Sequence, residues 1–161
     1  MGCLDYNSST GEFLWKIAPR RNTPAGAKAG CLTKAGYVVI GLFGKALKAH
    51  RLAWLISYGQ WPSKAIDHSN GVKWDNRIEN LREADASQNS SNQVTPCNST
   101  SGFKGVTYHK RHKKWQAKIM HRGKRHYLGV YRCPQEAAHA YNVAAIHLHG
   151  EFAVLNPVGD E

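Results

Sequence analysis

The chain has 161 residues, of which 42% are hydrophobic, enough for a folded core in one domain or two small ones. Its formal net charge of +11 predicts a polyanionic partner, although a ribosomal or membrane-surface protein could carry a similar charge. No apolar run approaches the length of a membrane span and no basic-then-apolar leader opens the sequence, so we expect no membrane association and a cytoplasmic location. The four cysteines form no C-x-x-C pair, which argues against a zinc ribbon or a disulfide framework.

The first fifty residues predict short strands joined by turns and one basic loop. Residues 4–15 contain two apolar pieces around a Ser-Thr-Gly turn, which is typical of a small hairpin. Residues 16–28 break this pattern and carry Arg20 and Arg21 between two prolines. We interpret them as a basic surface loop that contacts DNA, or alternatively as a solvated connector. Residues 36–48 predict two more strands around a glycine-containing turn.

Residues 50–59 have apolar side chains at helical spacing and predict a short helix that ends at Gly59. His50 lies where this helix should begin. It could help to bind a metal or a phosphate, but we favour a buried, hydrogen-bonded structural histidine. The Trp61-Pro62 step then turns the chain toward a strand that carries Asp67 and His68.

The stretch from Ile66 to Asn92 contains the residues best suited to chemistry. Ile66 leads into the pair Asp67-His68, and a polar loop and a short helix that carries Asn89 follow. Asp85 is a candidate N-cap for this helix, with Gln88 three residues later as in a capping box. The hard oxygen donors of Asp67 and Asn89 suit Mg²⁺ or Mn²⁺ better than zinc. A neutral His68 could take a proton from water.

In this stretch the sequence resembles the ββα-metal motif of HNH endonucleases of the phage and intron homing type. The residues that carry the resemblance are the Asp67-His68 pair, the Asn80-Leu81 step, Asn89 and the upstream segment from His50 to Pro62. The resemblance implies that His68 is the general base, that Asp67 and Asn89 hold the metal, and that Asn80 supports the loop. An asparagine-rich loop with an incidental histidine is the alternative. We expect Asn76 and Asn92 to be turn and surface residues.

From Ser90 to Gly102 the composition shifts to serine, asparagine, threonine and glycine, which predicts a linker. We therefore expect a nuclease domain at 1–92, a linker at 93–102 and a second domain at 103–158. The alternative for the linker is an ordered arm that lies along DNA.

The segment 103–158 has many lysines and arginines and no acidic residue before Glu136. Alternation predicts three strands, at 104–108, 115–120 and 124–131, with Trp115, Ala117 and Ile119 on one face. Pro134 is well placed to begin a helix whose alanine-rich stripe ends at Gly150. Such a helix would cover one side of the sheet and leave the basic side free.

This segment resembles the AP2 DNA-binding domain, on the residues Gly102-Phe103-Lys104-Gly105-Val106, Trp115-Gln116-Ala117-Lys118-Ile119, Tyr127-Leu128-Gly129 and the helix from Glu136 to Gly150. The resemblance implies that the exposed sheet face enters the major groove of DNA. Thr107 and Met120 stand where plant members commonly have arginine, which predicts fewer guanine contacts. The predicted DNA-binding residues are Lys104, His109, Arg111, Lys118, Arg125 and Tyr127, together with Arg20 and Arg21 of the basic loop.

Together the patterns predict an α+β protein, with an N-terminal ββα-metal nuclease module followed by a three-stranded antiparallel sheet packed on one helix. We expect a Mg²⁺- or Mn²⁺-dependent endonuclease that acts on double-stranded DNA in the cytoplasm of a bacterial or phage-infected cell. A single site favours a monomer that cuts one strand, with a dimer as the route to double-strand cleavage. The alternatives are a sequence-specific DNA-binding protein with an inactive nuclease module and an RNA-binding protein.

Overall fold

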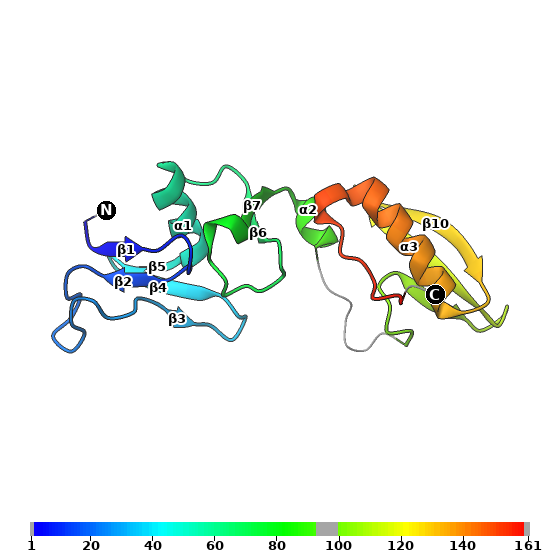
Figure 1. Cartoon of the computed structure of the whole chain (residues 1–161), viewed down its shortest axis with the longest axis horizontal. Helices are drawn as coiled ribbons and strands as arrows, with labels where there is room; N and C mark the ends of the chain where they lie inside the picture. Colours follow the sequence, from blue (N-terminus) through cyan, green and yellow to red (C-terminus); the bar gives the residue numbers. More distant parts are fainter. Residues whose placement is uncertain (1, 93–99, 160–161) are drawn as a thin grey trace. The chain divides into compact units, whose positions relative to one another are not determined.

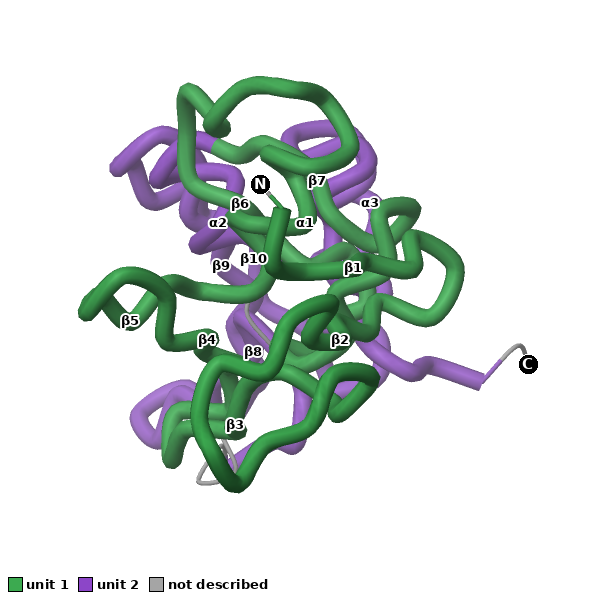
Figure 2. The backbone as a smooth tube through the Cα atoms, turned by 90° about the vertical axis from the view of Figure 1, so that its left-hand side faces the viewer, with its two compact units in different colours: residues 1–84 green, residues 85–161 purple. Residues whose placement is uncertain are grey.

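The computed structural model describes residues 2–92 and 100–159, and the chain divides into two compact units, Met1–Ala84 and Asp85–Glu161 (Figure 2). Most of the predicted linker, residues 93–99 with Cys97, lies outside the described residues. The division between the units falls earlier in the chain than this linker. In both units small antiparallel sheets are combined with few helices, which is the mixed α+β class predicted from the sequence.

The first unit consists of three small antiparallel sheets and one longer helix (Figure 1). The sheets pair β1 with β2, β3 with β4 and β5, and β6 with β7. The strands are β1 (Leu4–Tyr6), β2 (Phe13–Trp15), β3 (Cys31–Leu32), β4 (Val38–Leu42), β5 (Lys45–Lys48), β6 (Ala65–His68) and β7 (Leu81–Ala84). The helices are α1 (Ala49–Tyr58) and the 3-10 turn η1 (Ile78–Asn80). The predicted hairpin at 4–15 and the strand pair at 36–48 are confirmed.

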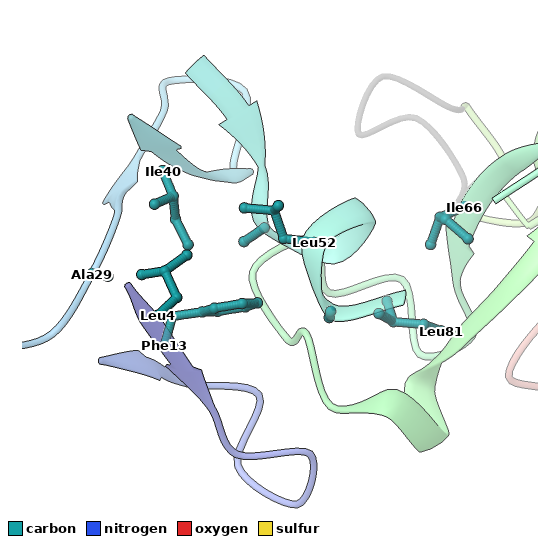
Figure 3. Packing of buried hydrophobic residues seen from close by; sticks show 9 residues of the cluster. Leu4, Phe13, Ala29, Ile40, Leu52, Ile66 and Leu81 are labelled. Carbon is teal, nitrogen blue, oxygen red and sulfur yellow. The ribbon is translucent and has the colours of Figure 1, made fainter. Parts of the chain in front are cut away.

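The core of the first unit forms where the strands meet α1. Phe13 and Ile40 are fully buried, and Leu52 of α1 packs in the same cluster (Figure 3). The helix ends as predicted at Gly59, whose left-handed backbone (φ 73°) lets its N–H donate to the Leu55 carbonyl. Ile66 and Leu81 extend this cluster to β6 and β7, so the strand that carries Asp67 and His68 is anchored in the core.

The second unit contains a three-stranded antiparallel sheet in the order β10-β9-β8 with a long helix packed on it. Its elements are α2 (Ala86–Ser91), β8 (Val106–His109), β9 (Lys114–His121), β10 (Lys124–Tyr131), α3 (Pro134–His149) and the 3-10 turn η2 (Gly150–Phe152). The three predicted strands and the helix beginning at Pro134 are confirmed, with strand ends shifted by a few residues. None of the helices in the described part of either unit is long and apolar enough to cross a membrane.

The sheet and α3 approach each other closely because small side chains line their interface. Ala117 and Ile119 of β9 are buried against α3, whose own Ala138 and Tyr141 have almost no exposed surface. Gly105 permits this approach, since a Cβ atom there would collide with the Tyr141 ring and the Lys118 carbonyl. The alternation predicted for β9 is therefore confirmed on its buried face.

We predict that Gly105→Ala destabilises the second unit far more than Gly123→Ala. Both glycines have φ of +74°, so both variants incur the left-handed backbone cost of about 1–2 kcal/mol. Only Gly105 lacks space for a methyl group, and overpacking should raise its cost to about 3 kcal/mol or more. Thermal unfolding of the two variants checks this, and equal losses of stability would contradict the packing account.

Candidate active site and DNA-binding surface

Strand β6 carries Asp67 and His68 at adjacent positions, and only 5% and 4% of their surface is exposed. The antiparallel register sets Asp67 directly opposite Arg82 of β7. Arg82 Nε donates to Asp67 Oδ2 at 3.0 Å, and Arg82 Nη2 forms an ion pair with the same oxygen at 3.0 Å. A buried carboxylate needs a partner of opposite charge, because removing it from water is otherwise very costly. Arg82, which the sequence did not identify, therefore holds the predicted metal ligand in place.

His68 lies among other rings. Its imidazole meets the His50 ring edge to face, with 5.1 Å between centroids and an interplanar angle of 84°, and lies 6.1 Å from the Tyr37 ring. Burial lowers the pKa of His68, against opposing effects of the Asn76 side chain and of the Asp67 carboxylate. The imidazole is therefore neutral at neutral pH, which is the form that can accept a proton.

The loop after His68 is held by two side chains, Asp75 and Asn80. Asn80 donates from Nδ2 to the Asp75 carbonyl at 2.8 Å, and its Oδ1 accepts from the Asn70 N–H at 3.0 Å. Asp75 is buried and receives two hydrogen bonds from the Arg77 guanidinium, at 2.9 and 2.8 Å, which lower its pKa to about 2. The Asn80 carbonyl accepts from the Ser69 N–H, so this network begins directly after His68.

The expectation that Asn76 and Asn92 are surface residues is wrong, since they are only 2% and 8% exposed. The Asn76 carbonyl accepts from the Tyr6 hydroxyl at 2.7 Å, and its Nδ2 donates to the Trp74 carbonyl. The first of these bonds ties the N-terminal hairpin to the loop beside His68. Such a contact joins segments seventy positions apart in the chain, so no local pattern indicates it.

His50, the first-turn histidine of α1, is buried as we favoured, with 4% of its surface exposed. Its Nδ1 has no hydrogen-bond partner among the residues that the structure describes. Burial, reinforced by His68, lowers the pKa of His50 to about 3. His50 thus presents a neutral ring to His68.

Asn89 lies in the first turn of α2, in the second unit. The predicted capping box is present, with Asp85 accepting from the Gln88 N–H and Gln88 accepting from the Asp85 N–H, each at 2.8 Å. The serines of α2 join it to the rest of this unit: Ser87 Oγ accepts from the Arg122 N–H at 3.2 Å, and Ser91 Oγ lies 3.1 Å from His149 Nδ1. These bonds explain why α2 belongs to the second unit.

The donor atoms predicted for a metal suit Mg²⁺ or Mn²⁺. Among residues 2–92 and 100–159, no group of three or more His, Cys, Asp and Glu side chains is gathered as a metal site would require. Mg²⁺ does not need one, because it is commonly held by one or two carboxylates together with water and substrate phosphates. The Asp67 carboxylate and the Asn89 carboxamide are hard oxygen donors of the required kind.

The free face of the second unit's sheet carries four of the eight predicted DNA-binding residues, and a fifth lies in an adjoining turn. Residues paired across antiparallel strands share a face. The pairs on this face are His109 with Lys114, Lys118 with Tyr127, and Met120 with Arg125. Arg125 and Tyr127 are exposed, and Arg111 is exposed in the turn between β8 and β9.

Three predicted DNA-binding residues lie elsewhere. The Lys104 side chain donates to the Ser91 carbonyl at the end of α2, and burial lowers its pKa. Arg20 and Arg21 are exposed in the first unit, in the loop between β2 and β3, where Arg20 and Thr23 form an isolated bridge.

Comparison with known proteins identifies the family. The family model described as HNH endonuclease matches residues 47–91. Protein 3.8 of Escherichia phage T7 is 33% identical over 112 residues, which cover 69% of this chain and 92% of that protein. An uncharacterized HNH endonuclease, L560 of Acanthamoeba polyphaga mimivirus, is 35% identical over 129 residues, which cover 79% of this chain and 66% of that protein. The chain belongs to the HNH endonuclease family.

A second similarity is to plant proteins. The AP2-like ethylene-responsive transcription factor CRL5 of Oryza sativa subsp. japonica is 47% identical over 58 residues, which cover 35% of this chain and 9% of that protein. The chain therefore combines an HNH part with an AP2-like part, and both point to DNA binding.

We predict that His50 makes the first unit less stable in mild acid. The pKa of His50 is about 3 in the folded protein, against about 6.5 when unfolded, so the unfolded chain binds the extra proton between these values. Stability is then unaffected above pH 6.5 and falls as the pH drops below it, by about 2 kcal/mol at pH 5. Urea unfolding at pH 8 and pH 5 should show a smaller loss for His50→Leu than for the wild type. An unchanged pH dependence in the variant would contradict the assignment.

Proposed function

We propose that this protein is a metal-dependent endonuclease that hydrolyses phosphodiester bonds in double-stranded DNA, with its AP2-like sheet binding the site. Membership of the HNH endonuclease family supports nuclease chemistry. The observation that carries the proposal is the buried pair on β6, in which an ion-paired Asp67 adjoins a neutral His68. This places a hard anionic ligand next to a general base.

In the proposed reaction His68 takes a proton from the attacking water as the water oxygen bonds to phosphorus. The bond from phosphorus to the 3′ oxygen breaks and this oxygen takes a proton from water, which leaves a 5′-phosphate and a 3′-hydroxyl. Asp67 and Asn89 would hold Mg²⁺ or Mn²⁺, which would contact the phosphate and stabilise the departing oxygen.

The other residues of the site have supporting roles. Asn80 positions His68 through the hydrogen bonds that brace the following loop. Arg82 keeps the Asp67 carboxylate oriented across the strand pair. We propose that the ββα-metal arrangement is completed by β6, β7 and α2, which follow one another in that order in the chain. One site favours a monomer that cuts a single strand, and a dimer would cut both.

The AP2-like sheet would deliver binding and site preference. Its basic face would enter the major groove, which is wide enough for β-strands, with Lys118, Arg125 and Tyr127 toward the DNA. This favours B-form duplex DNA over duplex RNA, whose deep and narrow major groove excludes a sheet. The viral relatives favour action inside a bacterial or phage-infected cell, in its cytoplasm.

The first test is cleavage of supercoiled plasmid by the wild type and by His68→Ala, with Mg²⁺. We expect the wild type to nick the plasmid and the variant to lose rate by about 10²–10⁴-fold, because it lacks the base. DNA affinity should change little, since no phosphate contact is removed. Cleavage at the wild-type rate would show that His68 is not the base. The absence of any wild-type cleavage, with site-specific binding retained, would favour the alternative of a DNA-binding protein with an inactive nuclease module.

A second test separates base contacts from backbone contacts in the AP2-like sheet. Arg125→Ala should reduce discrimination between a preferred and a scrambled duplex by about 1–3 kcal/mol, if its guanidinium reads a base edge. Lys113→Ala, in the exposed turn before β9, should weaken both duplexes alike and flatten the salt dependence by about one unit of slope. If Arg125→Ala weakens binding to both duplexes equally, the sheet contacts only the DNA backbone at this position.

A further inference from the structure

Two lysines from separate elements converge on Tyr37, beside His68. Lys48 ends β5, and Lys73 lies in the loop between β6 and η1. Their ammonium nitrogens lie 4.6 and 5.1 Å from the centroid of the Tyr37 ring. That ring is in turn 6.1 Å from the His68 ring, so both ammonium groups contact a ring that neighbours the proposed base.

The position of each lysine is held by the structure around it. Lys73 Nζ also donates to the Ala35 carbonyl at 3.3 Å, on the turn that precedes Tyr37. Its charge acts on His68, whose pKa it helps to lower, and Lys48 acts in the same way on His50. Tyr37 attracts both ammonium groups through its ring.

No carboxylate balances these charges. In the described parts of the chain neither Lys48 nor Lys73 forms an ion pair, and the neighbouring acids are engaged elsewhere, Asp67 by Arg82 and Asp75 by Arg77. Both ammonium groups on the Tyr37 ring therefore remain available to attract an anion.

The start of α1 is a second feature that favours an anion here. Lys48 is the N-cap residue of this ten-residue helix, and its side chain makes no capping hydrogen bond. The first turn contains no acidic residue. Neither a capping side chain nor a first-turn carboxylate therefore offsets the positive end of the helix dipole, which favours an anion such as phosphate.

We propose that Lys48, Lys73 and the start of α1 form a binding site for the phosphodiester that is cleaved, with Tyr37 as its floor. This rests on the proposed function and adds the residues that would hold the substrate. Ammonium groups bind phosphate as point charges and would stabilise the negative charge that grows on the non-bridging oxygens. Their place beside His68 would bring the phosphorus within reach of the water that His68 activates.

The test uses Lys48→Met, Lys73→Met and the double variant of the full chain, with Lys34→Met and Lys45→Met as controls. The control lysines are exposed in the same unit and lie in the β3–β4 turn and at the start of β5. At saturating DNA and Mg²⁺ we expect each site variant to cut about 10- to 10³-fold more slowly. Binding of DNA should lose about 0.9 of salt-dependence slope per lysine. The control variants should keep the wild-type cleavage rate and the wild-type salt-dependence slope. Lys73→Arg, which restores a positive charge, should recover most of the cleavage rate.

A DNA substrate with one uncharged methylphosphonate linkage shows which phosphate the lysines bind. Once the wild-type cleavage position is mapped, a methylphosphonate at that bond removes the charge that the lysines would hold. The rate difference between wild type and double variant should then shrink at least tenfold, whereas a methylphosphonate three positions away should leave it unchanged. An undiminished difference would overturn the proposal.

The possible failures are distinguishable. If the wild type cuts DNA and the site variants cut at the same rate with the same salt slope, the lysine site is wrong and the proposed function stands. If the wild type cuts no DNA, the proposed function fails. The salt slopes of the variants and controls still decide whether Lys48 and Lys73 hold a phosphate. If the Lys48 and Lys73 variants show the same salt-dependence slope of DNA binding as the control variants, the lysine site is overturned.

Discussion

The ion pair between Asp67 and Arg82 is the interaction on which the candidate site depends. It joins the two strands β6 and β7, and their antiparallel register places the two residues opposite each other. The same register leaves His68 opposite Leu81, whose side chain is in the core. An unpaired carboxylate at this depth would be protonated or would expose itself to water. The guanidinium therefore allows a charged ligand to lie next to a buried, neutral imidazole.

Other residues of the first unit hold the segments around Asp67 and His68 in place. Asn80 and Asp75 hold the following loop, and the Tyr6 hydroxyl joins this loop to the N-terminal hairpin. The His50 ring lies against His68 and is itself neutral. These contacts come from three separate parts of the chain, so the arrangement of the site depends on the fold of the whole unit. A general base that must meet one water and one phosphate benefits from such preorganisation.

Much of the local structure could be predicted from the sequence, because its signals are local. Gly59 ends α1, Asp85 and Gln88 form the capping box, and Pro134 begins α3, each within a few residues of the pattern that indicates it. Strand β7 was missed because Leu-Arg-Glu-Ala has no alternation and becomes a strand by pairing with β6. The sequence did not identify Arg82, Asp75 and Asn76 for a related reason. Their pairing or their burial depends on how segments of the unit pack together. The packing of α2 in the second unit likewise depends on Arg122 and His149, far along the chain.

The central claim is that Asp67 and His68 serve metal-dependent hydrolysis of a phosphodiester. It is tested most directly by analysing the ends of the products. An end-labelled duplex is incubated with the protein across a Mg²⁺ titration and in excess chelator, and each new end is identified as phosphate or hydroxyl. The account predicts 5′-phosphate and 3′-hydroxyl ends that appear only with the metal. Cleavage at full rate in excess chelator, or products with 3′-phosphate ends, would contradict it.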